Sequence, residues 1–232
     1  MKSLTYLLID LGCILIPLVA SFYPKQPFYK EWKYFFPANL TVATIFLTWD
    51  YKFTEVGVWG FNPDYLTGIY LANLPLEEVL FFICIPYACV FTFFSLKYLI
   101  QNNPLSHYQY YISIILIVHL FILGILNTSY AYTSITFLST AGYLLLCFAF
   151  KKDLSFAYLA YLIILPFFFI SNGILTGSWI SEPIVWYNDM ETLQIRIGSI
   201  PIEDTIYGML LIFLNIHLYT YFKNNFPSNK VP

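Results

Sequence analysis

Seven mainly apolar stretches divide this 232-residue chain. A helix needs about 20 apolar residues to cross the hydrocarbon core of a bilayer, and all but one stretch come close to that length. The stretches are Leu4–Phe22, Tyr34–Trp49, Pro75–Ile100, Tyr108–Leu126, Ala131–Phe150, Leu154–Leu175 and Pro201–Tyr221. The second has only 16 residues. We therefore predict an all-α integral membrane protein with seven transmembrane helices, forming a single membrane domain over residues 1–232.

The composition supports a membrane protein and excludes several other classes. Only 10% of the residues are charged, whereas a soluble domain has about 25%. The net charge is −2 and there is no basic patch, which argues against a nucleic-acid partner and leaves the lipid bilayer. The sequence has no CxxC pair, HExxH motif or GxGxxG fingerprint, so we expect no metal and no cofactor.

Lysine and arginine give the orientation, because cytoplasmic loops carry an excess of both. With seven spans, one side of the membrane holds Lys25, Lys30, Lys33, Lys97, Lys151, Lys152, Lys223 and Lys230. The other side holds Lys2, Lys52 and Arg196. This distribution predicts a multi-pass protein of the cell (inner) membrane with its N-terminus outside and its C-terminus in the cytoplasm.

An internal repeat is visible at the end of two long outer loops. Residues 74–81 read LPLEEVLF, and residues 200–207 read IPIEDTIY, an offset of 126 residues without a gap. We predict two parallel three-helix repeats, about 1–100 and about 131–222, joined by a connector helix at about 108–126. Parallel repeats are related by an axis along the membrane normal, which would bring the two acidic pairs together at one depth.

The paired acids at these helix starts are Glu77, Glu78, Glu203 and Asp204. A single acid in a first turn is usually a cap that complements the positive end of the helix. Two tandem pairs at equivalent positions exceed what capping needs. Clustered carboxyl groups in a low dielectric cannot all ionise, so at least one protonated acid would lie beside a carboxylate, as general acid–base catalysis requires.

At these residues the sequence resembles the flavin-independent, membrane-integral lycopene cyclases. The matching stretches are LPLEEVLFF (74–82), IRIGSIPIEDTIYG (195–208) and GVWGFNP (57–63). The chain looks like the fused form of the two-subunit bacterial and archaeal type, which is related to the cyclase domain of fungal bifunctional carotenoid enzymes. The resemblance implies a role in carotenoid biosynthesis, namely redox-neutral cyclisation of the ψ end groups of lycopene to β-ionone rings, giving β-carotene.

The resemblance also implies a lycopene β-cyclase with lycopene as its lipophilic partner, and contact with other carotenoid enzymes. We expect the four paired acids to form the catalytic set, with the donor and the acceptor of the proton left open. Aromatic faces attract cations and would stabilise a carbocation. The further candidates are Trp59, Phe81, Phe82 and Tyr207 for an aromatic wall, Asp50 and Asn172 for a hydrogen-bond shell, and Arg196 as a partner of a carboxylate or a solvated loop charge.

Three other readings fit a membrane bundle. The first is a rhodopsin-like protein that binds retinal or a carotenoid. A retinal Schiff base needs a lysine within a span, whereas Lys97 and Lys223 lie at span ends. A small transporter would carry broken helices near the midplane, whereas the paired acids lie at helix starts. A structural membrane subunit without catalytic activity is the third reading.

Overall fold

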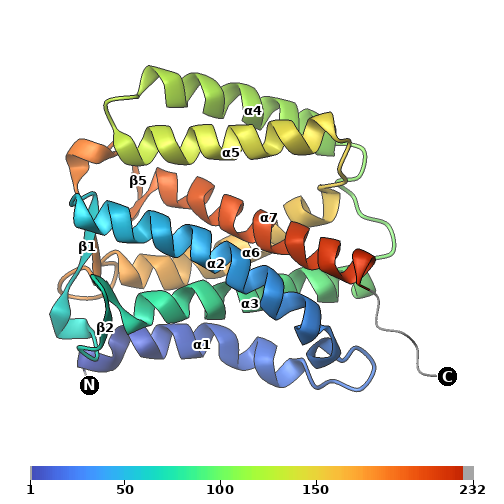
Figure 1. The fold of residues 1–232 in the computed structure, drawn as a ribbon, viewed down its shortest axis with the longest axis horizontal. Coiled ribbons are helices and arrows are strands. Elements are labelled where there is room, and N and C mark those ends of the chain that lie inside the picture. The colour runs from blue at the N-terminus through green and yellow to red at the C-terminus, as the bar shows by residue number, and fades with distance from the viewer. Residues whose placement is uncertain (1, 227–232) are drawn as a thin grey trace.

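The computed structural model describes residues 2–226, so the prediction for Lys230 lies outside the described residues. Within this part of the chain, seven α-helices run side by side (Figure 1). They are α1 (Thr5–Ala20), α2 (Trp32–Glu55), α3 (Leu76–Leu99), α4 (Gln109–Leu126), α5 (Ala131–Ala149), α6 (Ser155–Leu175) and α7 (Ile202–Asn225). Short 3₁₀ helices cover Lys2–Leu4, Phe28–Glu31, Pro63–Tyr65 and Asp189–Glu191.

Six of these helical segments are long and apolar enough to cross a membrane. They are Lys2–Ala20, Leu76–Leu99, Gln109–Leu126, Ala131–Ala149, Ser155–Leu175 and Ile202–Asn225. Helix α2 has 24 residues, well beyond the 16 of the predicted stretch, but it is more polar. It buries Asn39 and Asp50 and carries Lys52 and Glu55 in its last turn. The seven predicted helices are present, six of them have the character of a span, and a membrane crossing by α2 stays a prediction.

The two long loops form short strands, so the all-α prediction was incomplete. The strands are β1 (Trp59–Phe61), β2 (Tyr70–Leu71), β3 (Leu74–Pro75), β4 (Val185–Tyr187), β5 (Arg196–Ile197) and β6 (Ile200–Pro201). Antiparallel pairs form between β1 and β4, β2 and β3, and β5 and β6. The strands gather at one end of the helices (Figure 1), where they give the loop backbone hydrogen-bond partners that the helices do not supply.

The strands also reveal the symmetry of the molecule. Each strand of the second loop lies 126 residues after its counterpart in the first, as β4 (185–187) does after β1 (59–61). In the β1–β4 pair, Gly60 faces Trp186, its own counterpart 126 residues later. On either side, Trp59 faces Tyr187, the counterpart of Phe61, and Phe61 faces Val185, the counterpart of Trp59. This register places a two-fold axis between Gly60 and Trp186. A Cβ atom on Gly60 would lie 2.3 Å from the Trp186 ring, so any larger residue there would force this ring to shift.

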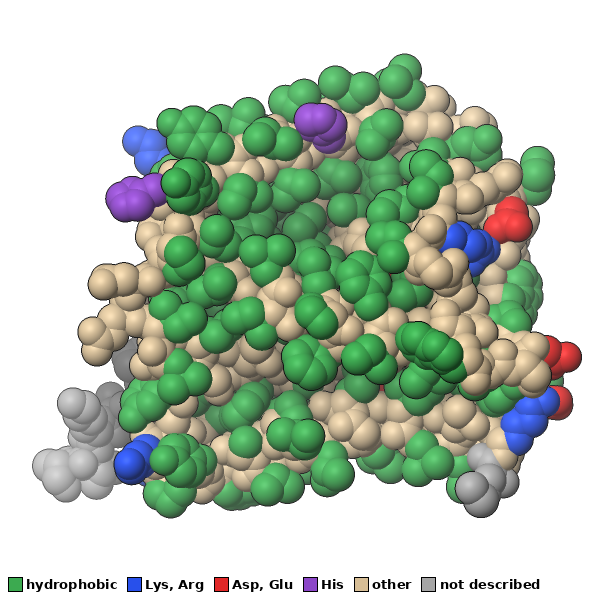
Figure 2. Space-filling view, turned by 180° about the vertical axis from the view of Figure 1, so that it is seen from behind, with side chains coloured by type: hydrophobic (Ala, Val, Ile, Leu, Met, Phe, Trp, Pro, Cys, Tyr) green, Lys and Arg blue, Asp and Glu red, His purple; other side chains and the backbone are tan. Residues whose placement is uncertain are grey.

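Helix packing follows the same symmetry. Helices α3 and α7 contact each other at the centre, α2 and α6 each contact both of them, and α1 and α5 pack on α3 and α7 respectively. Helix α4, which lies outside the two repeats, packs along α5 (Figure 1). Hydrophobic side chains cover most of the face in Figure 2, and the acidic side chains visible there lie at one end, as a protein surrounded by lipid requires.

Candidate active site

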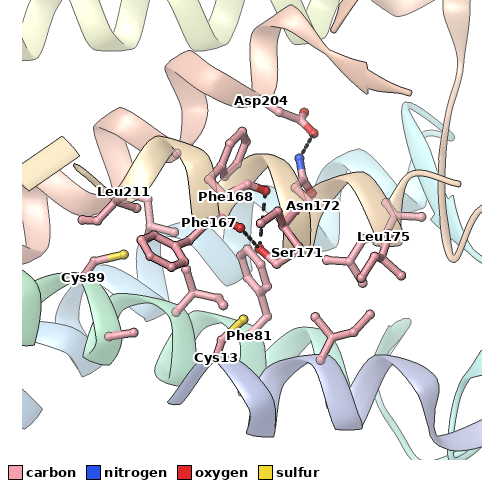
Figure 3. Close-up of a pocket in the computed structure, with 18 of the residues that line it drawn as sticks. Cys13, Phe81, Cys89, Phe167, Phe168, Ser171, Asn172, Leu175, Asp204 and Leu211 are labelled. Atoms are coloured by element: carbon pink, nitrogen blue, oxygen red, sulfur yellow. Dashed lines mark hydrogen bonds between the residues drawn. The ribbon is translucent and has the colours of Figure 1, made fainter. Parts of the chain in front are cut away.

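A cavity of about 570 Å³ lies between α1, α3, α6 and α7, and residues of the strands β1 and β4 also line it. Its lining is mostly apolar (Figure 3). A few polar side chains enter it, among them Asp50, Glu78, Asn172 and Asp204. An apolar cavity with a small number of converging polar groups is the usual form of a small-molecule site.

The helix starts explain which acids reach the cavity. Pro75 and Pro201 precede the first turns of α3 and α7, where a missing backbone N–H has no cost. Successive side chains on a helix point about 100° apart, so neighbouring acids face different surroundings. Glu78 and Asp204 line the cavity, one from each repeat and at equivalent positions.

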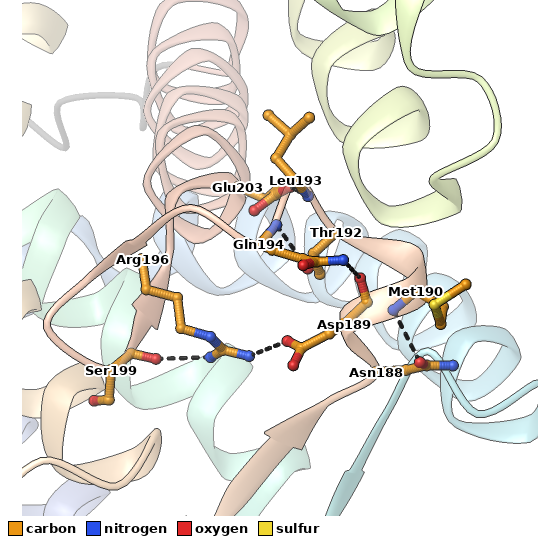
Figure 4. A network of polar contacts seen from close by, with 9 residues as sticks. All are labelled: Asn188, Asp189, Met190, Thr192, Leu193, Gln194, Arg196, Ser199 and Glu203. Carbon is orange, nitrogen blue, oxygen red and sulfur yellow. Dashed lines mark hydrogen bonds and ion pairs between the residues drawn. The ribbon is translucent and has the colours of Figure 1, made fainter.

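The other two acids hold the loops. Glu77 Oε1 accepts a hydrogen bond from the backbone N–H of Thr67 (2.6 Å), and Glu203 Oε1 accepts one from Leu193 (2.7 Å), again at equivalent positions. The hydroxyl of Thr133 also donates to Glu203 Oε1 (2.6 Å). Both glutamates are fully buried, and Figure 4 shows how the loop of the second repeat wraps over Glu203. These contacts tie each glutamate to the loop that precedes its helix, and neither is among the described residues that line the cavity, so a catalytic role for Glu77 and Glu203 stays a prediction.

Asp204 is surrounded by donors. The hydroxyl of Tyr132 donates to Oδ1 (2.6 Å), while Asn172 Nδ2 (2.8 Å) and the hydroxyl of Tyr187 (2.9 Å) donate to Oδ2. Burial, and then the nearby Asp204 carboxylate, raise the pKa of Tyr187 well above its usual range, so its hydroxyl keeps its proton. Hydrogen bonds of this kind favour the ionised form of a carboxyl group.

Glu78 has a simpler environment. Its Oε2 accepts a hydrogen bond from the hydroxyl of Tyr6 (2.5 Å), and no other hydrogen bond to it is found among the described residues. Tyr6 and Tyr132 stand 126 residues apart, like the acids that they contact. Sequence reasoning missed both tyrosines, although extending the 126-residue offset to the first helix of each repeat would have found them.

Aromatic rings surround the two acids. Phe81 and Tyr207, at equivalent positions, line the cavity together with Trp59 and Tyr132. The ring of Trp59 lies 5.1 Å from that of Tyr132 and 6.2 Å from that of Tyr207, centroid to centroid. The indole N–H of Trp59 donates to Asp50 Oδ1 (2.5 Å), which fixes the orientation of this ring. Phe61, Phe167, Phe168 and Tyr187 are further lining residues that sequence reasoning did not name.

The lycopene cyclase family model matches residues 3–96 and 129–222 of the chain. This chain belongs to the lycopene cyclase family. The two matched stretches of this lycopene cyclase family member begin 126 residues apart, at residue 129 and at residue 3, so the family pattern itself is repeated with the offset seen in the acids, the tyrosines and the strands. Members of the family act in carotenoid biosynthesis.

Two fungal proteins, both described as bifunctional lycopene cyclase/phytoene synthase, are similar to this family member. The protein of Pyrenophora tritici-repentis is 29% identical over 102 residues, which cover 43% of this chain and 16% of the relative. That of Colletotrichum graminicola is 38% identical over 69 residues, 30% of this chain and 11% of the relative. The matches thus span a small part of these longer relatives. No solved structure matches the chain.

Two predicted site residues of this lycopene cyclase family member lie away from the cavity. Phe82 is buried against α2, where its ring lies 6.1 Å from that of Phe46, and it is not among the described residues that line the cavity. Arg196 donates to Asp189 Oδ1 (2.7 Å) and to the carbonyl oxygen of Ser199 (2.8 Å) at the surface (Figure 4), rather than to a paired acid. Arg196 is thus a loop residue paired with the carboxylate of Asp189, away from the four paired acids.

Proposed function

We propose that the chain converts the ψ end groups of lycopene into β-ionone rings, forming β-carotene by acid–base catalysis without net redox change. The observation that carries this proposal is the meeting of Glu78 and Asp204, one from each repeat, in a single aromatic cavity of a lycopene cyclase family member. A cyclisation of this kind needs a proton donor, a weak base, cation-stabilising walls and the exclusion of water.

The hydrogen bonds support a division of labour between the two acids. Asp204 accepts three hydrogen bonds, which favour its carboxylate form and suit it to be the base. Glu78 accepts one, and an ionised carboxyl group is costly to bury with so few donors, which suits it to be the protonated acid. This assignment gives each acid one role at the start of the reaction.

In the proposed reaction, Glu78 gives its proton to C2 of the terminal alkene, leaving a tertiary cation at C1. The π electrons of the C5=C6 bond form a bond from C6 to C1 and move the cation to C5. Asp204 then takes the proton from C6, and those electrons form the C5=C6 bond of a β ring. The proton on Asp204 returns to Glu78, so neither an electron nor a cofactor is consumed.

The aromatic wall supports a cationic intermediate. Trp59, Tyr132 and Tyr207 present π faces and edges to the cavity near Glu78 and Asp204. A cation over an aromatic face gains about 2 kcal/mol or more when water is excluded. Asp50, whose Oδ2 has no hydrogen-bond partner among the described residues, adds a further carboxyl group to the cavity lining.

No lysine is found among the described residues that line the cavity. A retinal Schiff base requires one, so the cavity favours a carotenoid substrate over a covalently held retinal.

Expression in a lycopene-producing bacterium tests the proposal. Pigment extraction should yield β-carotene from cells carrying the full chain, and unchanged lycopene from cells carrying Glu78→Gln or Asp204→Asn. Glu55→Gln is a matched control, because Glu55 is exposed and pairs with Lys52. Unchanged lycopene with correctly inserted wild-type protein would refute the cyclase proposal, and full activity of Glu78→Gln would remove Glu78 as the acid.

The topology and the partners are part of the same proposal. We place the single membrane domain in the cell (inner) membrane, on the basis of the lysine distribution. The end that carries the strands would face the outside, and the C-terminus would lie in the cytoplasm. A C-terminal reporter that is active only in the cytoplasm would test this orientation. The fungal relatives are described as both cyclase and phytoene synthase, which supports contact between this chain and other carotenoid enzymes.

A further inference from the structure

The two-fold repeat should generate two equivalent spaces, and among the described residues a cavity is found in one of them. The open cavity lies between α1, α3, α6 and α7. A shift of 126 residues relates α1 to α5, α3 to α7, and α2 to α6. The symmetry-related space therefore lies between α5, α7, α2 and α3, and its state decides how many ring-forming sites the chain has.

Two phenylalanines occupy that second space. Gly208 and Asn172 line the open cavity, and their counterparts 126 residues earlier are Phe82 and Phe46. Both rings are 1% exposed and belong to one buried cluster that includes Val42, Ala43, Leu210 and Leu211. Where one half has Gly208, without a side chain, and the small amide of Asn172, the other half thus has the two packed rings of Phe82 and Phe46.

The second space is also closed on the side of α5 that corresponds to the exposed side of α1. Gly12 on α1 has open space where a Cβ atom would lie, and its counterpart on α5 is Leu138. Leu138 packs on Gly124 of α4 so closely that a Cβ atom on Gly124 would lie 2.7 Å from it. The connector helix therefore covers the face of α5 that corresponds to the free face of α1.

The open cavity, in contrast, reaches the lipid-facing surface between α1 and α6. Four lining residues are also largely exposed: Leu8 (57%), Ile16 (75%), Phe167 (69%) and Ile170 (56%). All four are apolar and belong to the helices α1 and α6, so the exposed edge of the cavity is hydrophobic. The wall between α1 and α6 thus offers a hydrophobic molecule a sideways route from the bilayer.

We infer that each chain has one ring-forming cavity, entered sideways between α1 and α6, and that the two ends of a linear carotenoid are cyclised there in separate binding events with release of the monocyclic product. This inference rests on the proposed function. Because Phe46 and Phe82 fill the second space, the far end of a bound carotenoid has no second site within the same chain and remains in the bilayer.

Isotope dilution tests the release step. The full chain, reconstituted in liposomes, receives ¹³C-lycopene together with an excess of unlabelled monocyclic carotene. We expect labelled monocyclic carotene to accumulate first, and the early bicyclic product to carry little label. Labelled bicyclic product that forms without delay and without dilution would overturn the inference. The absence of any ring would instead refute the proposed function, so the two failures are distinguishable.

Two substitutions test the filled and the open half. A Cβ atom on Gly208 would lie 3.6 Å from the Phe168 ring, which is ordinary contact, so the larger Gly208→Phe side chain would fill the cavity as Phe82 fills its counterpart. We expect Gly208→Phe to lose formation of the first and the second ring alike. Phe46→Leu, in the filled half, should keep the wild-type ratio of monocyclic to bicyclic product.

One outcome would contradict the inference directly. A Phe46→Leu protein that still forms the first ring but has lost the second would show that the filled half takes part in cyclisation. This result is informative even where Gly208→Phe fails to insert, because Phe46→Leu is read by its product ratio. Detergent size-exclusion profiles of both variants report whether the protein is folded.

Discussion

Removing the hydroxyl group of Tyr132 probes the proposed base most sharply. In Tyr132→Phe the ring stays in the cavity wall, but Asp204 Oδ1 loses its 2.6 Å hydrogen bond. A hydrogen bond to a charged group contributes about 1.5–3 kcal/mol, and each 1.36 kcal/mol is a factor of ten in rate. Asn172 and Tyr187 still hold Oδ2, so we expect the lower part of that range, a fall in kcat of about 10- to 30-fold.

The assay separates a role in catalysis from a role in binding or folding. Initial rates are measured with reconstituted protein over a range of lycopene concentrations, and kcat should fall while KM stays near its wild-type value. The matched control is Tyr219→Phe, because the buried Tyr219 hydroxyl donates to Glu31 Oε2 at 2.8 Å, far from the cavity. Full turnover of Tyr132→Phe, or an equal loss in the control, would refute the reasoning.

Three further substitutions test the surroundings of the cavity. Thr133→Val removes one of the two donors to Glu203 and should lower the free energy of unfolding by roughly 1–3 kcal/mol, measured by thermal denaturation in detergent. Arg196→Ala breaks a surface pair with Asp189 worth about 1 kcal/mol or less and should leave ring formation unchanged in the pigment assay. Trp59→Phe removes the only hydrogen bond found, among the described residues, to the buried carboxyl group of Asp50, so it should reduce both thermal stability and turnover.

Hydropathy alone located all seven helices but underestimated the length of α2. The predicted stretch Tyr34–Trp49 is contained in the longer helix Trp32–Glu55. The buried Asn39 and Asp50 lower the apolar character of α2. Asn39 donates to the carbonyl oxygen of Phe82 and Asp50 accepts from Trp59, so both side chains point into the protein instead of lipid. The hydropathy of a stretch does not distinguish these surroundings. The β1–β4 pair escaped prediction for a related reason, since its partner residues lie more than 120 positions apart in the sequence.

The repeat predicted the depth and proximity of the acids but not their directions. Glu77 and Glu78 are neighbours of the same kind, and only the packing of α3 decides that Glu78 lines the cavity while Glu77 binds a loop. The same holds for Phe81, which lines the cavity, and Phe82, which packs in the filled half. A pattern that treats both halves alike also cannot indicate that one of them is closed.

The pairing of β1 with β4 has a consequence for how the protein is made. β1 (59–61) emerges long before β4 (185–187), and four helices are synthesised in between. At about 5–20 residues per second, β1 waits on the order of ten seconds for its partner strand. Asp204 follows later still, so Glu78 spends the synthesis of most of the chain without its counterpart. The order of synthesis therefore delays the assembly of a competent site until the seventh helix is in place.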